Sequence, residues 1–331
     1  MLSEIEYPSF SGITSFMRTD LKSREEVGEG EYAIIGIPYD TTLGSRPGAR
    51  YAPRRIREQS IHFIYHLTAI DKEVIDVCSK SRYTCQAKKI VFDTGDVRVY
   101  PSNVTKTTDS IVKEISKVVK QGAIPIIMGG DHYVTYPCVK GVEKGLEEKN
   151  GYTPKIGYIH VDSHMDSYDY NETWGKYYHG SPARRISELD SVDIGNMVWV
   201  GLNGTTGYEP YCYMTEHNGT LFTINDIRES GIQAVMEKAY SIAEKDCDYV
   251  YVTMDIDVVD QAYSSGTGSF IYGGITAEEF LKAVDVISVK DKVIGFDVVE
   301  VAPNLDPTEN TARLAATALI NFLKPRIFIK N

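Results

Sequence analysis

Residues 155 to 166 read Lys-Ile-Gly-Tyr-Ile-His-Val-Asp-Ser-His-Met-Asp, an apolar run that ends in three alternating polar residues. The run is typical of a buried strand, and the alternation places Asp162, His164 and Asp166 on one face of the extended chain. A solvated strand end can alternate in the same way. Three acceptor groups this close nevertheless repel one another unless a cation lies between them. The stretch therefore predicts a strand whose C-terminal end binds a divalent metal.

Similar apolar runs recur along the chain. We expect strands at 32–38, 89–93, 123–128, 155–161, 196–201, 220–223, 248–254, 292–299 and 326–329. Segments with one apolar face predict helices from residue 52 onward and near 105–121, 134–147, 182–190, 226–244, 276–287 and 308–322. Alternation of this kind indicates an α/β protein with a mostly parallel sheet covered by helices on both faces.

The chain shows no internal repeat, low-complexity tract or Pro/Ser-rich linker. Residues 1–30 mix Pro, Gly, Ser and charged residues without periodicity, so we expect an irregular arm packed on the remainder. Residues 31–331 are long enough to form one large catalytic domain with a substantial core.

The composition of the chain excludes several classes of function. The net charge of −11 argues against a nucleic-acid binder and favours a small cationic substrate. Five widely spaced cysteines without a CxxC pair indicate reduced thiols rather than disulfides or a structural zinc site. The N-terminus lacks the features of a signal peptide, and no apolar run approaches 18 residues. We therefore expect a cytoplasmic protein without membrane contacts.

Three further polar groups follow predicted strands. They are His132 in Met-Gly-Gly-Asp-His, Asp255 and Asp257 in Met-Asp-Ile-Asp, and Glu300 in Asp-Val-Val-Glu. Taken singly, each has an ordinary alternative as a hydrogen-bonded core histidine, a strand-end cap or a solvated acid. The C-terminal ends of parallel strands are, however, where open α/β sheets place their ligand sites. We expect these groups to form one site with the first motif.

The combined set offers two imidazoles and four carboxylates, which suffice for two divalent ions if carboxylates bridge them. The six expected ligands are His132, Asp162, His164, Asp166, Asp255 and Asp257. This oxygen-rich mixture suits Mn²⁺, with Ni²⁺, Co²⁺ and Fe²⁺ as alternatives. Two such ions about 3.5 to 4 Å apart can activate a bridging water, so the predicted reaction class is metal-assisted hydrolysis. A two-metal phosphoesterase also fits the carboxylates, but no basic phosphate-binding cluster accompanies them.

The motifs together resemble those of the ureohydrolase family, which comprises arginases, agmatinases and related guanidino hydrolases. The similar segments are Gly130 to His132, Asp162 to Asp166, Asp255 to Asp260, and Glu300. Phe10 to Arg18 is similar to the N-terminal arm of agmatinase-type members, and Gly36 to Asp40 together with Arg46 to Arg50 is similar to their first strand and loop. The resemblance covers nearly the whole chain. It implies a three-layer α/β/α arginase-like fold, two Mn²⁺ ions per subunit, and a homotrimer or homohexamer.

The resemblance also implies roles for individual residues. His132 and Asp166 would bind one manganese, His164 and Asp257 the other, and Asp162 and Asp255 would bridge the two. His179 matches the histidine that shuttles protons at the mouth of the site, for which an imidazole is suited. Glu300 matches the acid that orients the substrate guanidinium. A metal-bridging hydroxide would attack the guanidinium carbon, whereas Asp131 and His160 would support the ligands.

The segment after the first motif carries the clues to the substrate. Tyr168 and Gly175 stand where arginases carry an Asn and a Ser, which disfavours arginase. Residues 167–185 are similar to agmatinases and guanidino-acid hydrolases, and Tyr168, Asp169 and Trp174 are the expected substrate contacts. Asp169 or Glu172 can attract the amine of agmatine, and Lys176 or Arg184 the carboxylate of 4-guanidinobutyrate. All four fit solvated surface charges equally well.

The sequence also departs from the family pattern. Thr253 replaces the usual Ser, Gln261 replaces the usual Pro, and residues 264–270 differ from the usual Ala-Pro-Gly-Thr-Gly-Thr-Pro run. These changes leave the six expected ligands intact and alter the predicted rim of the site.

The leading hypothesis is hydrolysis of agmatine to putrescine and urea, a step of polyamine metabolism. Alternatives within the family are hydrolysis of 4-guanidinobutyrate or 3-guanidinopropionate, of free guanidine, of formimidoylglutamate, and lastly of arginine. A different class is a non-catalytic paralogue that keeps the fold as a regulatory or scaffolding subunit.

Overall fold

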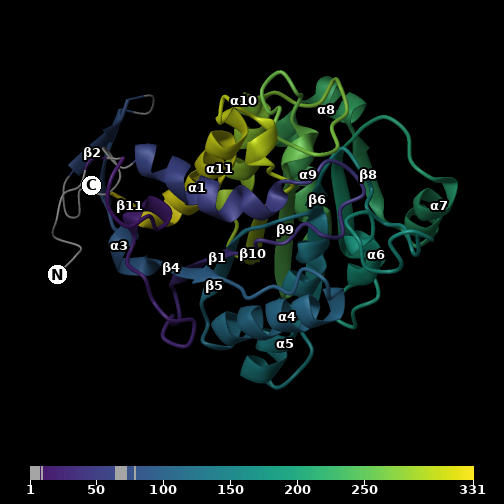
Figure 1. Cartoon of the computed structure of the whole chain (residues 1–331), viewed down its shortest axis with the longest axis horizontal. Coiled ribbons are helices and arrows are strands. Elements are labelled where there is room, and N and C mark those ends of the chain that lie inside the picture. Colours follow the sequence, from purple (N-terminus) through teal and green to yellow (C-terminus); the bar gives the residue numbers. More distant parts are fainter. Residues whose placement is uncertain (1–7, 9, 64–72, 78–79) are drawn as a thin grey trace.

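The computed structural model describes residues 8, 10–63, 73–77 and 80–331, so Cys78 and the first residues of the expected arm lie outside it (Figure 1). The described residues form an eight-stranded sheet in the order β4-β1-β5-β10-β9-β6-β7-β8. Its strands are Val91–Asp96 (β4), Tyr32–Gly36 (β1), Ile124–Met128 (β5), Val293–Val299 (β10), Tyr249–Asp255 (β9), Ile156–Val161 (β6), Met197–Leu202 (β7) and Thr220–Thr223 (β8). Their pairings are parallel. The predicted parallel α/β sheet is confirmed.

Helices cover both faces of this sheet (Figure 1). On one face lie Ala52–Ser60 (α1), Ile224–Ser230 (α8), Ile232–Ala243 (α9), Ala277–Ser288 (α10) and Asn310–Ile327 (α11). On the other lie Val104–Lys120 (α4), Thr135–Asn150 (α5) and Pro182–Ile186 (α6). Successive strand residues enter opposite cores: Ile34 packs in the first and Ile35 in the second. The three-layer α/β/α architecture is thus confirmed.

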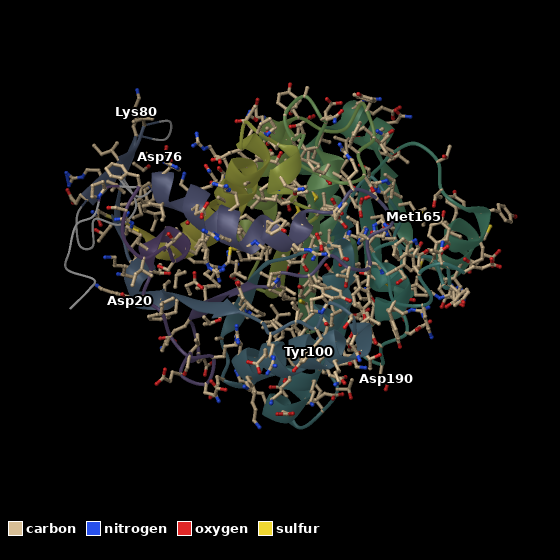
Figure 2. The ribbon with its side chains drawn as sticks, viewed as in Figure 1. Asp20, Asp76, Lys80, Tyr100, Met165 and Asp190 are labelled. Atoms are coloured by element: carbon tan, nitrogen blue, oxygen red, sulfur yellow. The ribbon has the colours of Figure 1, made fainter. Side chains whose placement is uncertain are left out.

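A second, antiparallel sheet was not predicted. It contains Phe328–Lys330 (β11), Ser81–Cys85 (β3) and Glu73–Asp76 (β2), so the strand expected near 326–329 pairs outside the main sheet. The short helix Ala87–Ile90 (α3) follows β3. Figure 2 places Asp76 and Lys80 at one end of the molecule and Met165 toward the other. The small sheet is therefore remote from the motif that opens the sequence argument.

One predicted helix was wrong in detail, and one helix was missed. The helix expected over 226–244 is two helices, α8 and α9, because Gly231 adopts φ 81° between them. The helix Tyr208–Glu216 (α7) was not predicted, since its aromatic and polar residues show little apolar periodicity.

The described part of the expected arm contacts the main body. The backbone N–H of Phe16 donates to Asp93 Oδ2 at 2.8 Å, and that of Met17 donates to Ser60 Oγ at 2.8 Å. Both apolar side chains are buried. The division into an arm at 1–30 and one catalytic domain at 31–331 stays a prediction. The four described cysteines are free, and among the described residues no helix has the length and apolar character to cross a bilayer.

Candidate metal centre and active site

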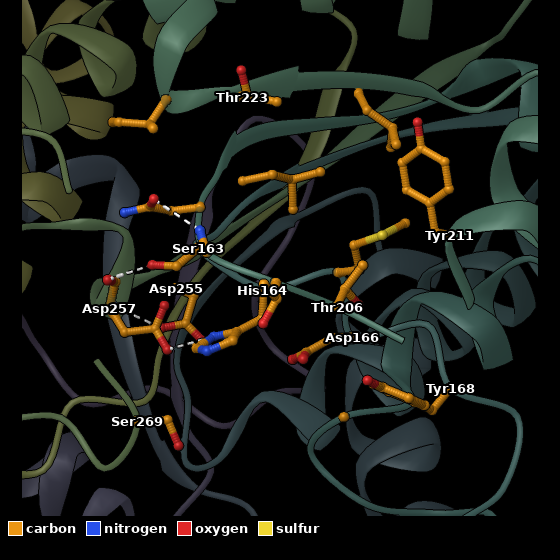
Figure 3. A pocket seen from close by; sticks show the side chains of 18 of the residues that line it. Ser163, His164, Asp166, Tyr168, Thr206, Tyr211, Thr223, Asp255, Asp257 and Ser269 are labelled. Atoms are coloured by element: carbon orange, nitrogen blue, oxygen red, sulfur yellow. Dashed lines mark hydrogen bonds and ion pairs between the residues drawn. The ribbon is translucent and has the colours of Figure 1, made fainter. Parts of the chain in front are cut away.

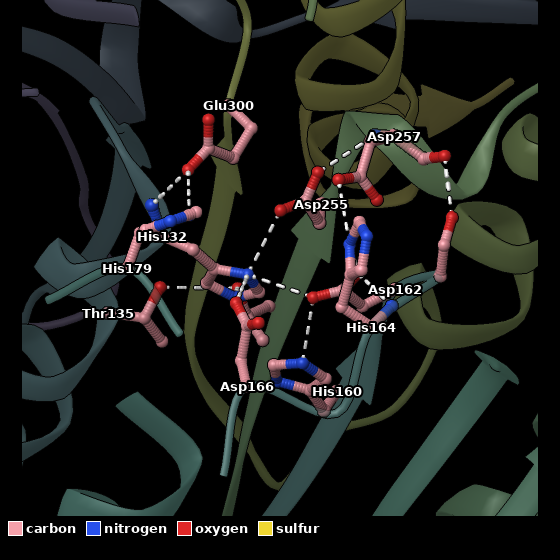
Figure 4. A network of polar contacts seen from close by, with 12 residues as sticks. His132, Thr135, His160, Asp162, His164, Asp166, His179, Asp255, Asp257 and Glu300 are labelled. Carbon is pink, nitrogen blue, oxygen red and sulfur yellow. Dashed lines mark hydrogen bonds and ion pairs between the residues drawn. The ribbon is translucent and has the colours of Figure 1, made fainter. Parts of the chain in front are cut away.

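Four neighbouring strands end at the same edge of the sheet with polar side chains. The strands β5, β10, β9 and β6 are adjacent in the sheet although they are distant in sequence. His132 follows β5, Asp162 to Asp166 follow β6, Asp255 and Asp257 close β9, and Glu300 follows β10 (Figure 4). The fold thus brings together all six expected ligands and Glu300, as the convergence of parallel strand ends requires.

The turns after β6 and β9 fix two carboxylates. Asp162 Oδ1 accepts a hydrogen bond of 2.6 Å from the backbone N–H of His164. Asp255 Oδ1 accepts one of 2.8 Å from the backbone N–H of Asp257. Each carboxylate therefore closes a local Asx turn with one oxygen. The other oxygen of each is left to face the centre of the site.

Backbone strain accompanies this arrangement. Asp166 has φ 45° and Glu300 has φ 60°, values that residues with a side chain rarely adopt. Gly130 is also constrained, because a Cβ there would lie 1.7 Å from the carbonyl oxygen of Tyr39. The carbonyl of Gly130 accepts from the backbone N–H of Glu300 at 2.9 Å. The Gly-Gly turn after β5 is therefore what permits His132 and Glu300 to lie side by side.

Imidazole nitrogens and carboxylate oxygens converge to within ion-pair distance of one another (Figure 4). His132 Nδ1 lies 3.0 Å from Asp162 Oδ2, 3.1 Å from Asp166 Oδ2 and 3.0 Å from Asp255 Oδ2. His164 Nδ1 lies 3.1 Å from Asp257 Oδ2 and 3.4 Å from Asp162 Oδ1. Asp162 thus faces both imidazoles, one with each oxygen.

These short distances do not satisfy the polar atoms. His132 Nδ1, Asp162 Oδ2 and Asp257 Oδ1 are buried without a partner of hydrogen-bond geometry among the described residues. Buried polar atoms are normally paired, because leaving one unpaired is costly. A cation between the atoms would satisfy all three. The donor set therefore fits metal binding better than a hydrogen-bonded core.

The atoms form two compact groups that share Asp162. Ligating atoms of His132, His160, Asp162 and Asp166 lie within 4.8 Å of one another, and so do those of Asp162, His164 and Asp257. The shared carboxylate agrees with the bridging role expected for Asp162. His160 joins the first group although the sequence suggested only a supporting role, and Asp255 approaches that group through its contact with His132.

The charges of the cluster also favour a cation. Burial, together with the neighbouring Asp257 and Asp162, raises the pKa of Asp255 well above its usual value. Burial raises the pKa of Asp257 to about 6 although His164 opposes this shift. Ionised carboxylates at these positions therefore cost free energy unless positive charge compensates them.

His160 lies directly behind the cluster. Its Nδ1 atom is 2.8 Å from the hydroxyl of Tyr158, and its Nε2 atom is 2.9 Å from Asp162 Oδ2. Its ring stacks on that of His132, with centroids 4.6 Å apart and planes 3° apart. His160 is therefore placed to support the imidazole of His132, and its Nε2 atom lies beside the shared carboxylate without hydrogen-bond geometry.

A second buried chain of polar groups holds the other side of His132. His132 Nε2 lies 3.1 Å from Thr253 Oγ1, and the Thr253 hydroxyl donates to Asp297 Oδ1. Asp297 Oδ2 accepts from the hydroxyl of Tyr251 at 2.7 Å. The chain leaves Nδ1 as the nitrogen of His132 that faces the cluster. Thr253, one of the departures from the family pattern, thus retains a hydroxyl that contacts the imidazole.

A cavity of about 810 Å³ opens beside the cluster. Figure 3 shows Asp255, Asp257 and His164 along one part of its wall and Tyr211 and Thr223 farther away. Glu300 and His179 also line it, and His179 Nδ1 is 3.8 Å from Glu300 Oε1. Both expected catalytic side chains therefore face the space next to the cluster.

The expected substrate contacts are only partly at this cavity. Tyr168 lines it and accepts a hydrogen bond from the backbone N–H of Gly207 at 2.9 Å. Asp169 and Trp174 are not among the described residues of the lining, and Asp169 is paired with Arg185.

The other charged residues considered from the sequence lie outside the lining too. Lys176 lies 3.7 Å from Glu188, and Arg184 pairs with Glu209 at 3.1 Å. Glu172 is likewise absent from the described lining residues. The lining instead includes Arg228, Asn203 and Tyr211, which the sequence did not single out. Asn203 directly follows a predicted strand, whereas no local sequence pattern marked Arg228 or Tyr211.

The chain is similar to known proteins over nearly its full length. A model of the arginase family matches residues 30–324. The chain is 32% identical over 315 residues to the mitochondrial guanidino acid hydrolase of Homo sapiens, covering 94% of this chain and 82% of that protein. It is 31% identical over 305 residues to the agmatinase of Bacillus subtilis, covering 92% of this chain and 94% of that protein. The solved structure of proclavaminate amidino hydrolase from Streptomyces clavuligerus superposes with a TM-score of 0.80 at 27% identity, covering 97% of this chain and 100% of that one.

Proposed function

Because the chain belongs to the arginase family, we propose that it hydrolyses a guanidino compound at the edge of its sheet. It is a hydrolase of C–N bonds in linear amidines, the class to which its relatives' names refer. The observation that carries the proposal is the convergence of unsatisfied imidazole and carboxylate atoms beside a cavity lined by Glu300 and His179.

We assign two divalent cations to the cluster. His132 and Asp166 would hold one, His164 and Asp257 the other, and Asp162 and Asp255 would contact both. One nitrogen and several oxygens per ion favour Mn²⁺, with Ni²⁺ or Co²⁺ as alternatives. Such ions supply a nucleophile at neutral pH by acidifying water.

Glu300 would orient the substrate. Its Oε1 atom accepts a hydrogen bond of 2.9 Å from the backbone N–H of His132, which fixes the carboxyl group beside the cluster. Burial, together with Asp255 and Asp131, raises the pKa of Glu300. A guanidinium placed next to it favours the ionised form, and a planar guanidinium pairs well with a carboxylate. The guanidinium carbon is thereby held toward the cluster.

His179 would move the proton that the reaction requires. Water adds its oxygen to the guanidinium carbon, the bond to the alkyl nitrogen breaks, and that nitrogen leaves as an amine after taking up a proton. Burial lowers the pKa of His179, so the ring is largely neutral at pH 7 and can accept a proton and pass it on. The Nδ1 atom, on the side of Glu300, is the nitrogen placed for this transfer.

The test is urea release by the metal-loaded protein. Agmatine, the substrate that the sequence favoured, is compared with 4-guanidinobutyrate, 3-guanidinopropionate, arginine and free guanidine after loading with Mn²⁺ or Ni²⁺. Formimidoylglutamate is assayed in parallel for formamide. We expect urea from at least one guanidino compound. Absence of product from every compound would contradict the proposal and favour a non-catalytic paralogue.

Two further expectations complete the proposal. A homotrimer or homohexamer is expected from the family resemblance, and light scattering coupled to size-exclusion chromatography would test it. A cytoplasmic location is expected from the sequence, and fractionation of cells that express the tagged full chain would test that.

A further inference from the structure

The cavity is electrostatically asymmetric. The acids in its described lining are Asp166, Asp255, Asp257 and Glu300, which lie at the proposed metal and guanidinium sites. The rest of the described lining is neutral apart from one arginine, Arg228, and the histidines next to the cluster. A substrate held by its guanidinium at the acidic end therefore meets either neutral groups or Arg228 with its other end.

Arg228 lies well away from the cluster. It belongs to α8, which follows β8, and β8 is two positions from β6 in the sheet order. Two strand spacings place the ends of β6 and β8 roughly 10 Å apart. Figure 3 shows Thr223, at the end of β8, on another part of the cavity wall than His164, Asp255 and Asp257. A short substrate and the long arginine side chain can together span this distance.

The guanidinium of Arg228 is oriented by neutral groups. Its Nη2 atom donates to the carbonyl oxygen of Gly273 at 2.9 Å, and its Nη1 atom lies 3.4 Å from Asn225 Oδ1. The backbone N–H of Gly273 in turn donates to Asp260 Oδ2 at 2.7 Å. No ion pair joins Arg228 to a carboxylate within the described part of the chain. Its positive charge and its remaining N–H donors are therefore left for a ligand.

The neighbouring arginines differ in this respect. Arg184 pairs with Glu209, and Arg185 pairs with Asp169 and Glu188. Asp169 is thereby neutralised by a buried arginine and does not line the cavity. The distal ammonium of agmatine would find no carboxylate in the outer part of the described lining, whereas a carboxylate would find Arg228.

We propose that Arg228 binds a negatively charged group at the far end of the substrate, which makes the substrate a guanidino acid. This inference rests on the proposed hydrolysis and specifies its substrate class. An arginine suits the task, because its planar donors can bind both oxygens of a carboxylate. The net charge of −11 attracts cations to the protein surface as a whole, but it does not select between the ends of a bound molecule.

The first experiment compares two substrates of similar length, 4-guanidinobutyrate and agmatine, in the Mn²⁺-loaded wild type and Arg228→Gln. We expect a higher kcat/KM for the acid in the wild type. Arg228→Gln should lower kcat/KM for the acid about 10- to 100-fold, mainly through KM, and leave that for agmatine nearly unchanged. Arg228→Lys should restore part of the loss. Arg54→Gln is the matched control, since it removes the same charge from an exposed arginine on α1 whose one ion pair within the described residues is with Glu58.

The inference would be overturned if the wild type had a higher kcat/KM for agmatine than for 4-guanidinobutyrate. It would also be overturned if Arg228→Gln lowered kcat/KM equally for both substrates. If no compound yields urea, the proposed hydrolysis is wrong. The role of Arg228 is then tested by binding of 4-guanidinobutyrate instead of by its hydrolysis. Calorimetric titration with 4-guanidinobutyrate should then show binding to the wild type and at least tenfold weaker binding to Arg228→Gln. Equal binding, or none to either protein, would overturn the inference independently.

Discussion

The Nε2 atom of His160 lies 2.9 Å from Oδ2 of Asp162, the carboxylate that belongs to both groups of ligating side chains. The opposite nitrogen of His160 is held by Tyr158, and the ring stacks on His132. His160 is thus fixed on three sides by groups that are themselves buried. His160 therefore supports the cluster from behind, through the ring of His132 and beside the shared carboxylate.

Removal of His160 should weaken metal binding. His160→Ala removes the ring that stacks on His132 and the nitrogen beside Asp162 Oδ2, and loss of such supporting contacts typically costs about 10- to 100-fold in metal affinity. His160→Gln keeps a nitrogen near the Nε2 position and should lose less. Competition with a chelating indicator measures the affinity for Mn²⁺. Wild-type affinity in His160→Ala, with a folded protein confirmed by its melting curve, would refute the positioning role.

Glu300→Gln should impair substrate binding while sparing the metals. The amide oxygen can still accept from the backbone N–H of His132, so the local fold is preserved. Loss of the charge removes a charge-assisted bond to the guanidinium, which should lower kcat/KM about 10- to 100-fold. Steady-state urea release measures the loss of kcat/KM, and mass spectrometry measures whether the metal content is unchanged. A loss of bound metal comparable to the loss of activity would assign Glu300 to metal binding instead.

His179→Ala should reduce turnover and leave the metal content unchanged. Removal of a general acid or base typically costs about 10² to 10⁴ in rate. The wild-type rate should fall at acidic pH as His179 becomes protonated, at a pH below 6.5 because burial lowers its pKa. His179→Ala should lose this limb of the kcat profile. An unchanged kcat or an unchanged profile would exclude the proton-transfer role.

Asp306 should stabilise the fold at neutral pH. Its carboxylate accepts hydrogen bonds from the hydroxyl groups of Thr308 and Thr311 and from their backbone N–H groups, the latter at 2.9 Å and 2.8 Å. Burial raises the pKa of Asp306, but these bonds outweigh it and lower the pKa below 3.8. The stabilisation is therefore present above about pH 4 and is lost as pH falls through the folded-state pKa.

Asp306→Asn should thus lower the free energy of unfolding by about 1 to 3 kcal/mol at pH 7. The difference in unfolding free energy between variant and wild type should narrow as pH falls from about 4 through the folded-state pKa of Asp306, where the wild-type carboxyl becomes neutral too. Urea-induced unfolding of both proteins at several pH values measures the loss of unfolding free energy and its dependence on pH. A pH-independent difference would mean that the charge of Asp306 contributes nothing.

The sequence predicted the centre of the site better than its rim. Asp162, His164 and Asp166 alternate after an apolar strand, and that local pattern sufficed because parallel strands converge at one edge of a sheet. The sheet, its layers and the meeting of four strand ends followed from the same reasoning. Helix α7 and the β2–β3 pair were missed because partly exposed, polar segments carry weak periodicity.

Residues that depend on contacts between distant segments could not be predicted. Arg228 lines the cavity with its guanidinium donating to the carbonyl oxygen of Gly273, 45 positions away, and this contact is not visible in the local sequence. Asp169 looked equally suited to bind a substrate amine, yet Arg185 pairs with it. Charge alone therefore did not distinguish a cavity residue from a paired surface residue.

The most direct test of the central claim is a titration of the metal-free protein with Mn²⁺ while urea release from 4-guanidinobutyrate and from agmatine is followed. We predict that activity toward at least one of them rises until two equivalents per chain are bound and then stays constant, because both groups of side chains around Asp162 must be filled. Saturation at one equivalent, or no urea at any loading, would contradict the account.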